Sequence, residues 1–218
     1  TYGHDGFVYS GASDNQVHKI NPSTLETAGI YRGHSHMILT IILGPDGYLY
    51  SGSYDSQVHK IDPKTMQKAN DMPNMYDNGI WVHSLVFGPD RYLYLGSRED
   101  NKVHKIDPQT IAKAVDMPNT HTHGGPVRSV VFDLDGFLYS GSDNNQVHKL
   151  DPKTMAKAAN TPNTYNYGGN VYHMRYGADG FLYVGGNNNL ARKVDPKTMD
   201  AVGSYNVNGD SWHSAFDI

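Results

Sequence analysis

The 218-residue sequence has no cysteine, only two tryptophans and no long apolar segment. Without cysteine there can be no disulfide and no thiolate metal site, and the redox compartment is left open. No apolar run approaches the roughly 20 residues that a membrane-spanning helix requires, so we expect no membrane span. There is also no cluster of lysine or arginine, and the formal net charge is −4. The composition therefore argues against a nucleic-acid partner.

Helical periodicity is missing as well, whereas glycine, proline and tyrosine recur at fixed offsets. The clearest unit is DGFLYSGSDNNQVHKLDPKTM at 135–155, and related units follow four other aspartates. The leading aspartates are 41, 44, 45 and 44 residues apart, in the order Asp5, Asp46, Asp90, Asp135 and Asp179. Repeats of about 40–50 residues that carry several short strands are typical of a β-propeller with one repeat per blade.

Each repeat divides into four predicted strands, which in the fourth repeat begin with Arg128–Phe132 and Phe137–Ser140. Gln146–Leu150 follows, and a last strand starts near Met155. Aromatic and β-branched residues between Gly, Asn, Asp and Pro turns give this prediction. The strands that precede the Asp-Gly turns are the inner ones: Leu39–Leu43, His83–Phe87, Arg128–Phe132, Tyr172–Tyr176 and His213–Asp217.

The two ends of the chain are predicted to share one blade. The chain opens on the Asp5 turn with almost no strand before it, and it closes on the inner strand His213–Asp217 with no turn behind it. A C-terminal strand that completes the first blade would remove the free sheet edges. We therefore predict an all-β protein in which residues 1–218 form a single five-bladed β-propeller of four-stranded blades.

Loop composition distinguishes the two faces of this predicted propeller. The turns after the first and third strands are nearly identical among repeats, as in the GPDG and DPKT sequences, which is typical of structural turns. The loops after the second and fourth strands vary in length and carry many His, Tyr and Asn residues, among them Tyr76, His121 and Tyr165. Because binding residues concentrate on variable loops over a rigid scaffold, we expect the partner there.

A second group of candidate residues lies at the starts of the inner strands, which border one axis. The aligned positions hold His83, Arg128, Tyr172, His173 and His213, and the tryptophans Trp81 and Trp212 precede two of these strands. Such residues favour a small-molecule site at the mouth of a central channel, or hydrogen bonds across a narrow hub. A donor-rich pocket around Arg128 would suit a carboxylate, sulfate or sugar hydroxyls, so we expect an anion or ordered water and no metal there.

Two further histidine patterns have structural alternatives. The VHKI histidines (His18, His59, His104 and His148) are too far apart in a ring to share an ion, so we expect inter-blade packing with a hydrogen bond to the neighbouring blade. The pairs His34/His36 and His121/His123 alternate on extended segments. With a carboxylate they could bind Zn or Cu, but the favoured alternative is surface-loop histidine.

The pattern DGxLYxGSxxxxVxKIDPxT resembles the repeats of PQQ-like and YVTN-like propellers. In blade number and length the chain is similar to the five-bladed tachylectin lectins. Their core resembles LGPDGYLY at Leu43–Tyr50, and their Gly-Gly before the inner strand resembles Gly124-Gly125 and Gly168-Gly169. Those lectins bind amino sugars once per blade through loops with repeated tryptophans, so the resemblance implies glycan binding.

These features favour a non-catalytic binding or scaffold propeller that recognises a glycan or protein partner. Two alternatives stay open: a self-assembling structural subunit of an extracellular assembly, and a His-based lyase or metal-dependent hydrolase at the central channel. No nucleophile elbow, phosphate loop or HExxH motif is present, and the inner positions lack a carboxylate pair. We expect no cofactor. A start at Thr1 is compatible with a processed secreted chain or a trimmed one, and we expect an extracellular or cell-surface location.

Overall fold

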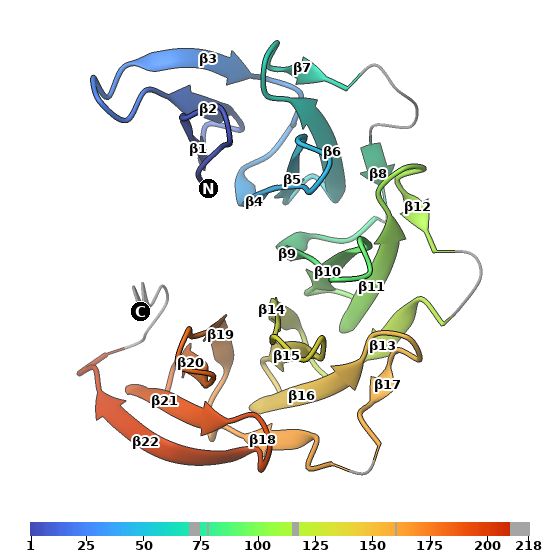
Figure 1. Ribbon diagram of the computed structural model, residues 1–218, viewed down its shortest axis with the longest axis vertical. Coiled ribbons are helices and arrows are strands. Elements are labelled where there is room, and N and C mark those ends of the chain that lie inside the picture. Colours follow the sequence, from blue (N-terminus) through green and yellow to red (C-terminus); the bar gives the residue numbers. More distant parts are fainter. Residues whose placement is uncertain (70–74, 78, 115–117, 160, 210–218) are drawn as a thin grey trace. The chain divides into compact units, whose positions relative to one another are not determined.

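The computed structural model of the chain describes residues 1–69, 75–77, 79–114, 118–159 and 161–209 (Figure 1). These residues form five antiparallel sheets and contain no helix. None of the described segments is therefore a helix able to cross a membrane. The chain divides into two compact units, the first formed by residues 1–95 and 106–113 and the second by the remaining described residues.

The first two sheets belong to the first unit. The first sheet has three strands in chain order: β1 (Val8–Gly11), β2 (Val17–Ile20) and β3 (Thr27–Tyr31). The second sheet has four strands in chain order and a fifth, β8, that pairs with β6: β4 (Ile38–Leu43), β5 (Leu49–Ser53), β6 (Gln57–Asp62), β7 (Gln67–Lys68) and β8 (Met75–Asp77).

The third sheet has residues in both units, and the last two sheets belong to the second. The third sheet comprises β9 (Val82–Phe87), β10 (Leu93–Ser97), β11 (Lys102–Asp107), β12 (Ala112–Lys113) and β13 (Thr120–Thr122). The fourth comprises β14 (Val127–Phe132), β15 (Leu138–Ser142), β16 (Gln146–Asp151), β17 (Ala156–Lys157) and β18 (Thr164–Asn166). The fifth comprises β19 (Val171–Tyr176), β20 (Leu182–Gly186), β21 (Leu190–Asp195) and β22 (Asp200–Asn206).

The strand prediction is confirmed for the first three strands of the repeats. All four inner strands that the structure describes begin one residue before the predicted start. One sheet per repeat, with consecutive strands side by side, is consistent with a β-propeller. The predicted strand His213–Asp217 lies outside the described residues, so closure of the first sheet stays a prediction. In the described part of the chain that sheet has three strands and one isolated bridge, between Tyr2 and Val8.

The last strand of the middle repeats differs from the prediction. In the second, third and fourth repeats it is split into two short pieces, such as β17 and β18, which both pair with β16. These repeats contain a proline between the pieces, and proline cannot donate a ladder hydrogen bond. In the fourth repeat, the Nδ2 amide of Asn163 donates to the Ala158 carbonyl at 3.1 Å across the interruption. The first and fifth repeats lack this proline, and their last strands β3 and β22 are continuous.

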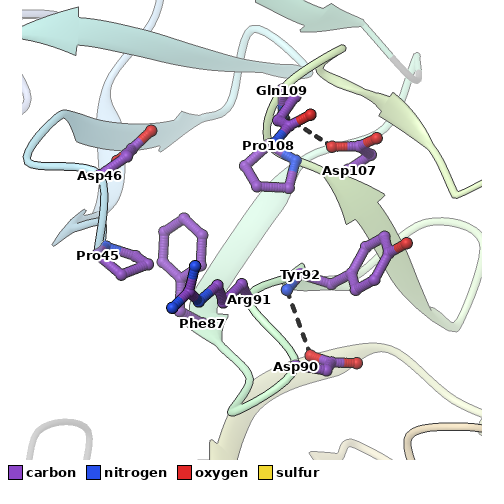
Figure 2. Close-up of a pocket in the computed structure, with 9 residues that line it drawn as sticks. All are labelled: Pro45, Asp46, Phe87, Asp90, Arg91, Tyr92, Asp107, Pro108 and Gln109. Atoms are coloured by element: carbon purple, nitrogen blue, oxygen red, sulfur yellow. Dashed lines mark hydrogen bonds between the residues drawn. The ribbon is translucent and has the colours of Figure 1, made fainter.

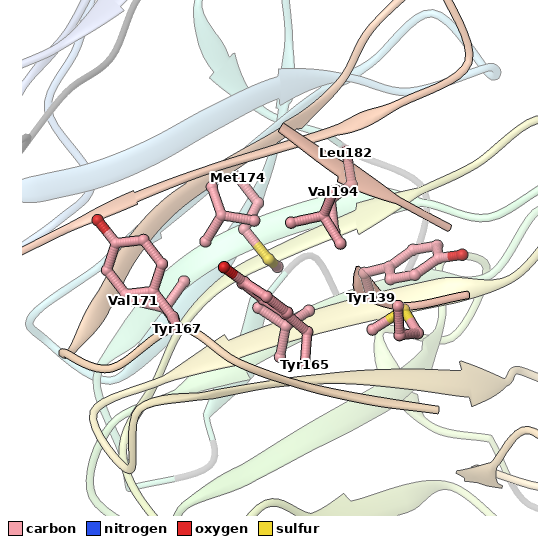
Figure 3. Close-up of a cluster of buried hydrophobic side chains, with 10 residues drawn as sticks. Tyr139, Tyr165, Tyr167, Val171, Met174, Leu182 and Val194 are labelled. Carbon is pink, nitrogen blue, oxygen red and sulfur yellow. The ribbon is translucent and has the colours of Figure 1, made fainter. Parts of the chain in front are cut away.

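Hydrophobic cores lie between successive sheets. In the second unit, Tyr139 and Val147 of the fourth sheet pack with Val171, Leu182 and Val194 of the fifth (Figure 3). All five side chains are fully buried. The sheets approach so closely that a Cβ on Gly141 would lie 2.4 Å from a Val171 methyl carbon, and this explains the glycine of the LYSG motif.

A buried lysine on the third strand recurs in this packing. Lys149 Nζ lies 4.2 Å from the centroid of the Phe137 ring and donates to the Pro196 carbonyl of the next repeat at 2.9 Å. Lys19 donates in the same way to Pro63 at 2.8 Å. A cation placed over an aromatic face and bonded to a carbonyl is stabilised despite its burial. The lysine of VHKI and the proline of DPKT are therefore partners across two repeats.

The leading aspartate of the repeat closes the turn between the first two strands. In the second repeat, Asp46 accepts a hydrogen bond from the Tyr50 hydroxyl at 2.7 Å and forms an ion pair with Lys60 at 3.1 Å. In the third repeat, Asp90 accepts from the Tyr92 backbone amide at 3.2 Å (Figure 2). The residue two positions earlier is glycine in these repeats. A Cβ on Gly44 would lie 2.6 Å from Asp46 Oδ1.

In the fourth repeat, a different aspartate accepts the hydrogen bonds of this turn. Asp133 occupies the glycine position, and its carboxylate accepts from the Tyr139 hydroxyl at 2.9 Å and from the Phe137 amide at 2.8 Å. The leading residue Asp135 is exposed. In this repeat, Asp133 therefore accepts the hydrogen bonds of the turn, although Asp135 is the residue that aligns with the leading aspartates of the other repeats.

We predict that Asp46→Ala and Asp135→Ala differ in their effect on stability, although the two residues align in sequence. Asp46→Ala removes the counter-charge of the buried Lys60 and the acceptor of Tyr50, so the free energy of unfolding should fall by about 1–3 kcal/mol. Asp135→Ala changes an exposed side chain and should stay within about 0.5 kcal/mol of the parent. Urea denaturation measures both. Equal losses in the two variants would contradict this account of the turn.

Candidate functional site

The structure describes eight of the ten predicted site residues, and Trp212 and His213 lie outside the described part. In the first unit, Trp81 and His83 come together with Tyr54 of the loop between β5 and β6. The Tyr54 ring centroid lies 4.4 Å from that of Trp81 and 5.8 Å from that of His83. The exposed His36 ring packs on Tyr54 at 5.5 Å. We call these four residues the aromatic patch.

In the second unit, Arg128 and Tyr172 form a cluster with Asp143. The Arg128 guanidinium donates two hydrogen bonds to the Asp143 carboxylate, at 2.5 and 2.7 Å, and lies 4.8 Å from the centroid of the Tyr172 ring. We expected an anion or ordered water near Arg128. The anion that the structure shows there is this carboxylate of the chain itself. The bidentate pair neutralises the charge that would otherwise attract an anionic ligand.

The predicted loop residues lie elsewhere than expected. Tyr76 and Tyr165 are on the short strands β8 and β18, with 7% and 8% of their surface exposed, and each belongs to a hydrophobic core. His121 is half-buried on β13. These positions are strand and not loop because their backbones pair with the third strand of the same sheet. His173 is half-buried on β19. A binding role for these residues stays a prediction.

Four of the histidines outside the inner strands form two stacked pairs. His34 stacks on His59 with ring centroids 3.8 Å apart and an angle of 11°, and His123 stacks on His148 at 3.7 Å and 5°. The expectation of surface-loop histidine was wrong for His34 and His123, which are 6% and 3% exposed. In each His-x-His pair, one ring turns inward to stack on the VHKI histidine of the next repeat.

Hydrogen bonds between neighbouring repeats complete these pairs. The Tyr31 hydroxyl of the first sheet bonds to Nδ1 of His59 at 2.6 Å, and His121 Nε2 of the third sheet lies 3.0 Å from Nδ1 of His148. The prediction of inter-blade packing is thus confirmed for His59 and His148. His104 differs from the prediction, because among the described residues its hydrogen bond goes from Nε2 to Asp100 of its own hairpin, at 2.7 Å. His18 Nε2 likewise bonds to Asp14 at 2.8 Å, and its packing against a neighbouring blade stays a prediction.

One group among the described residues has the ligand types of a metal site. Ligand atoms of His34, Asp55 and His59 lie within 4.8 Å of one another. A metal bound by imidazole lies in the ring plane at about 2.0–2.1 Å from nitrogen. A metal shared by two nearly parallel rings 3.8 Å apart would instead lie well outside both planes. The stacked geometry therefore does not fit an ion held by both imidazoles.

The same group contains the hydrogen-bond order of a nucleophilic triad. Asp55 pairs with His34 Nδ1 at 2.8 Å, and His34 Nε2 lies 2.8 Å from the Ser51 hydroxyl. An Asp–His–Ser relay of this kind can activate a serine when substrate reaches it. Here Ser51 is fully buried and His34 is covered by His59, so the relay holds the loop before β4 in place.

Burial determines the protonation state of the stacked histidines. It lowers the pKa of His59 to about 3, that of His123 to about 4 and that of His148 to about 2. The charge of the neighbouring histidine acts in the same direction at His59 and His148. At neutral pH these rings are therefore uncharged, and they pack as polar aromatic side chains.

Sequence reasoning missed two residues that organise these clusters. Tyr54 and Asp143 occupy the same position, eight residues after the leading aspartate, and each contacts an inner-strand residue. This position varies from repeat to repeat, and a comparison of the repeats there would have identified it. The inward turn of His34 has no such signal, because only packing selects which histidine of the pair is buried.

Comparisons with known proteins support the fold but assign no family. No family model matches the chain, and no curated protein matches it. Among solved structures, the chain is similar to one chain of "Crystal Structure of Mitotic Checkpoint Complex", with a TM-score of 0.79 and 17% sequence identity. The match covers 94% of this chain and 63% of that chain, so it spans less than two thirds of the similar protein. At this identity the likeness shows the fold alone.

The stacked pairs predict a loss of stability in acid. Below pH 6.5 the unfolded chain takes up protons on histidines that stay neutral when folded, so stability declines as the pH falls from 6.5 towards 4. Each buried histidine contributes up to about 1.4 kcal/mol per pH unit. His123→Tyr places the tyrosine of the fifth repeat, Tyr167, at this position, and it should flatten the decline. Urea denaturation between pH 4 and 7.5 measures the slope.

The exposed His4 provides the control for this experiment. His4→Ala should leave the slope of stability against pH unchanged, because it removes a histidine that takes no part in the stacked pairs. A slope that is the same in the parent and in His123→Tyr would refute the assignment of acid sensitivity to the stacked pairs.

Proposed function

We propose that this chain is a non-catalytic binding module, a five-bladed propeller that recognises a partner protein through the variable loops that follow its second and fourth strands. The five repeats with one sheet each support the five-bladed ring. The similar solved chain belongs to a complex, which is compatible with a role in protein assembly. A closed ring would leave the variable loops as the irregular part of an otherwise repetitive scaffold.

The aromatic patch is the observation that carries this proposal. Its tyrosine, tryptophan and two histidines come from three separate segments of the first unit, and none of them is fully buried. Tryptophan and tyrosine are enriched at interface hot spots because they combine a large apolar surface with a polar group. A partly exposed group of such rings is typical of a recognition surface and not of a core.

The orientation of the rings favours a protein over a glycan. The three contacts on Tyr54 have interplanar angles of 47° to Trp81 and 71° to His36 and His83, so the rings do not present one flat platform. A surface of rings at different angles suits side chains of a partner, whereas a sugar ring stacks on a single exposed face. Glycan binding is the alternative, and self-assembly and an extracellular or cell-surface location are further parts of the proposal.

The test compares Trp81→Ala with the parent protein. Removing a central hot-spot tryptophan should weaken binding at least tenfold, or by about 1.4 kcal/mol or more. The partner is enriched from an extract of the source, purified and measured by interferometry, while a glycan array is probed in parallel. Leu134→Ala is the control, because it removes an 85% exposed apolar side chain from a structural turn.

The outcomes separate the partner classes. Binding to purified protein that Trp81→Ala weakens and Leu134→Ala does not would support the proposal. Binding to glycans that depends on Trp81 would replace the protein partner with a sugar. Labelling of Ser51 by a fluorophosphonate probe in the native protein would contradict the non-catalytic assignment, because it would require a serine that is accessible and activated.

A further inference from the structure

A pocket of about 500 Å3 opens in the first unit among the turns and not among the variable loops. The second and third sheets contribute its lining (Figure 2): Pro45, Asp46, Phe87, Asp90, Arg91, Tyr92, Asp107, Pro108 and Gln109. Its volume lies in the range of small-molecule sites, and proline and aromatic rings provide apolar walls. The sequence patterns treated these turns as structural, so this pocket lies outside the predicted binding surface.

Arg91 is the residue that distinguishes this turn from its counterparts. Its backbone has a φ of 65°, in the left-handed region, and the other four repeats have glycine there, with φ between 82° and 85°. Glycine adopts this conformation without the steric cost that a side chain adds. An arginine kept at such a position suggests that its side chain has a use.

Within the described residues, the guanidinium of Arg91 is available to bind a ligand. Within the described part of the chain it has no recorded ion pair or hydrogen bond, and the side chain is exposed. Figure 2 shows it extending towards Pro45 and Phe87, at the apolar wall of the pocket. Gln109, which also lines the pocket, replaces the lysine found in three other DPKT-type turns and offers an amide there.

The carboxylates in the lining form hydrogen bonds and an ion pair with other residues of the protein. Asp46 binds Tyr50 and Lys60, and Asp90 accepts from the Tyr92 amide and from the Tyr94 hydroxyl at 2.7 Å. Asp107 accepts from the Gln109 backbone amide at 2.8 Å. In Figure 2 the carboxyl groups of Asp46 and Asp90 point away from Phe87 and Arg91. The side-chain donors in the lining that these turn contacts do not use include the guanidinium of Arg91 and the amide of Gln109.

We propose that this pocket binds a small organic carboxylate with an apolar body. Arg91 would donate two parallel hydrogen bonds to the carboxylate, as the planar guanidinium commonly does. The Phe87 ring and the two prolines, Pro45 and Pro108, would contact the apolar body. The site is separate from the aromatic patch, so its ligand and the partner protein are recognised by different residues.

The test uses benzoate as the carboxylate probe and benzamide as its uncharged analogue of the same shape. Titration followed by amide NMR should show saturable shifts at Arg91 and Gln109 with benzoate, and at least tenfold weaker binding of benzamide. Arg91→Gly restores the residue of the other repeats and fits the backbone, so it should melt at the same or a higher temperature. Its affinity for benzoate should be at least tenfold lower.

Two further variants make the result specific. Arg32→Ala removes another exposed arginine of the first unit and should leave benzoate binding unchanged. Trp81→Ala should also leave it unchanged, which separates this site from the proposed partner surface. The proposal is overturned if benzoate shows no saturable binding, if benzamide binds as well as benzoate, or if Arg91→Gly binds like the parent. Equal competition by inorganic phosphate would overturn the role of the apolar wall.

Discussion

The contacts of the lysine on the third strand of each repeat are the interaction on which the arrangement of the sheets depends. In four repeats its ammonium group lies over aromatic rings of its own sheet. In three repeats it donates to the proline carbonyl of the next: Lys19 to Pro63, Lys105 to Pro152 and Lys149 to Pro196. A buried cation without such partners would destabilise the protein by several kcal/mol. The requirement therefore fixes the register of one sheet against the next and explains why the third-strand lysine and the proline of the following turn occur in every repeat.

The candidate functional residues occur where a repeat departs from this common solution. Arg91 replaces a turn glycine, Tyr54 and Asp143 occupy one variable loop position, and Trp81 precedes only one described inner strand. A scaffold stabilised many times over by the same contacts tolerates such changes locally. A substitution at a position that makes none of the shared contacts can thus change binding without loss of the fold.

The histidines show how one repeated residue type can have several roles. His59 and His148 are buried in stacked pairs between neighbouring sheets, whereas His18 and His104 bond to an aspartate of their own hairpins. Their side chains occupy equivalent positions on the third strand. The difference comes from the preceding loop, which supplies a second inward ring at His34 and His123 and so excludes water and charge from the pair.

The amino-acid sequence was enough to predict the second and third strands of the repeats, the described inner strands and the one-sheet-per-repeat organisation, because period, turn residues and strand propensity are local properties. It also placed Arg128 near Tyr172, since aligned positions of neighbouring inner strands become neighbours in space. Three features became visible only in the folded chain: Asp143 neutralises Arg128, Tyr76 and Tyr165 are buried, and the pocket at Arg91 lies among the structural turns. These outcomes depend on how side chains from distant segments pack and pair, and no single repeat carries that information.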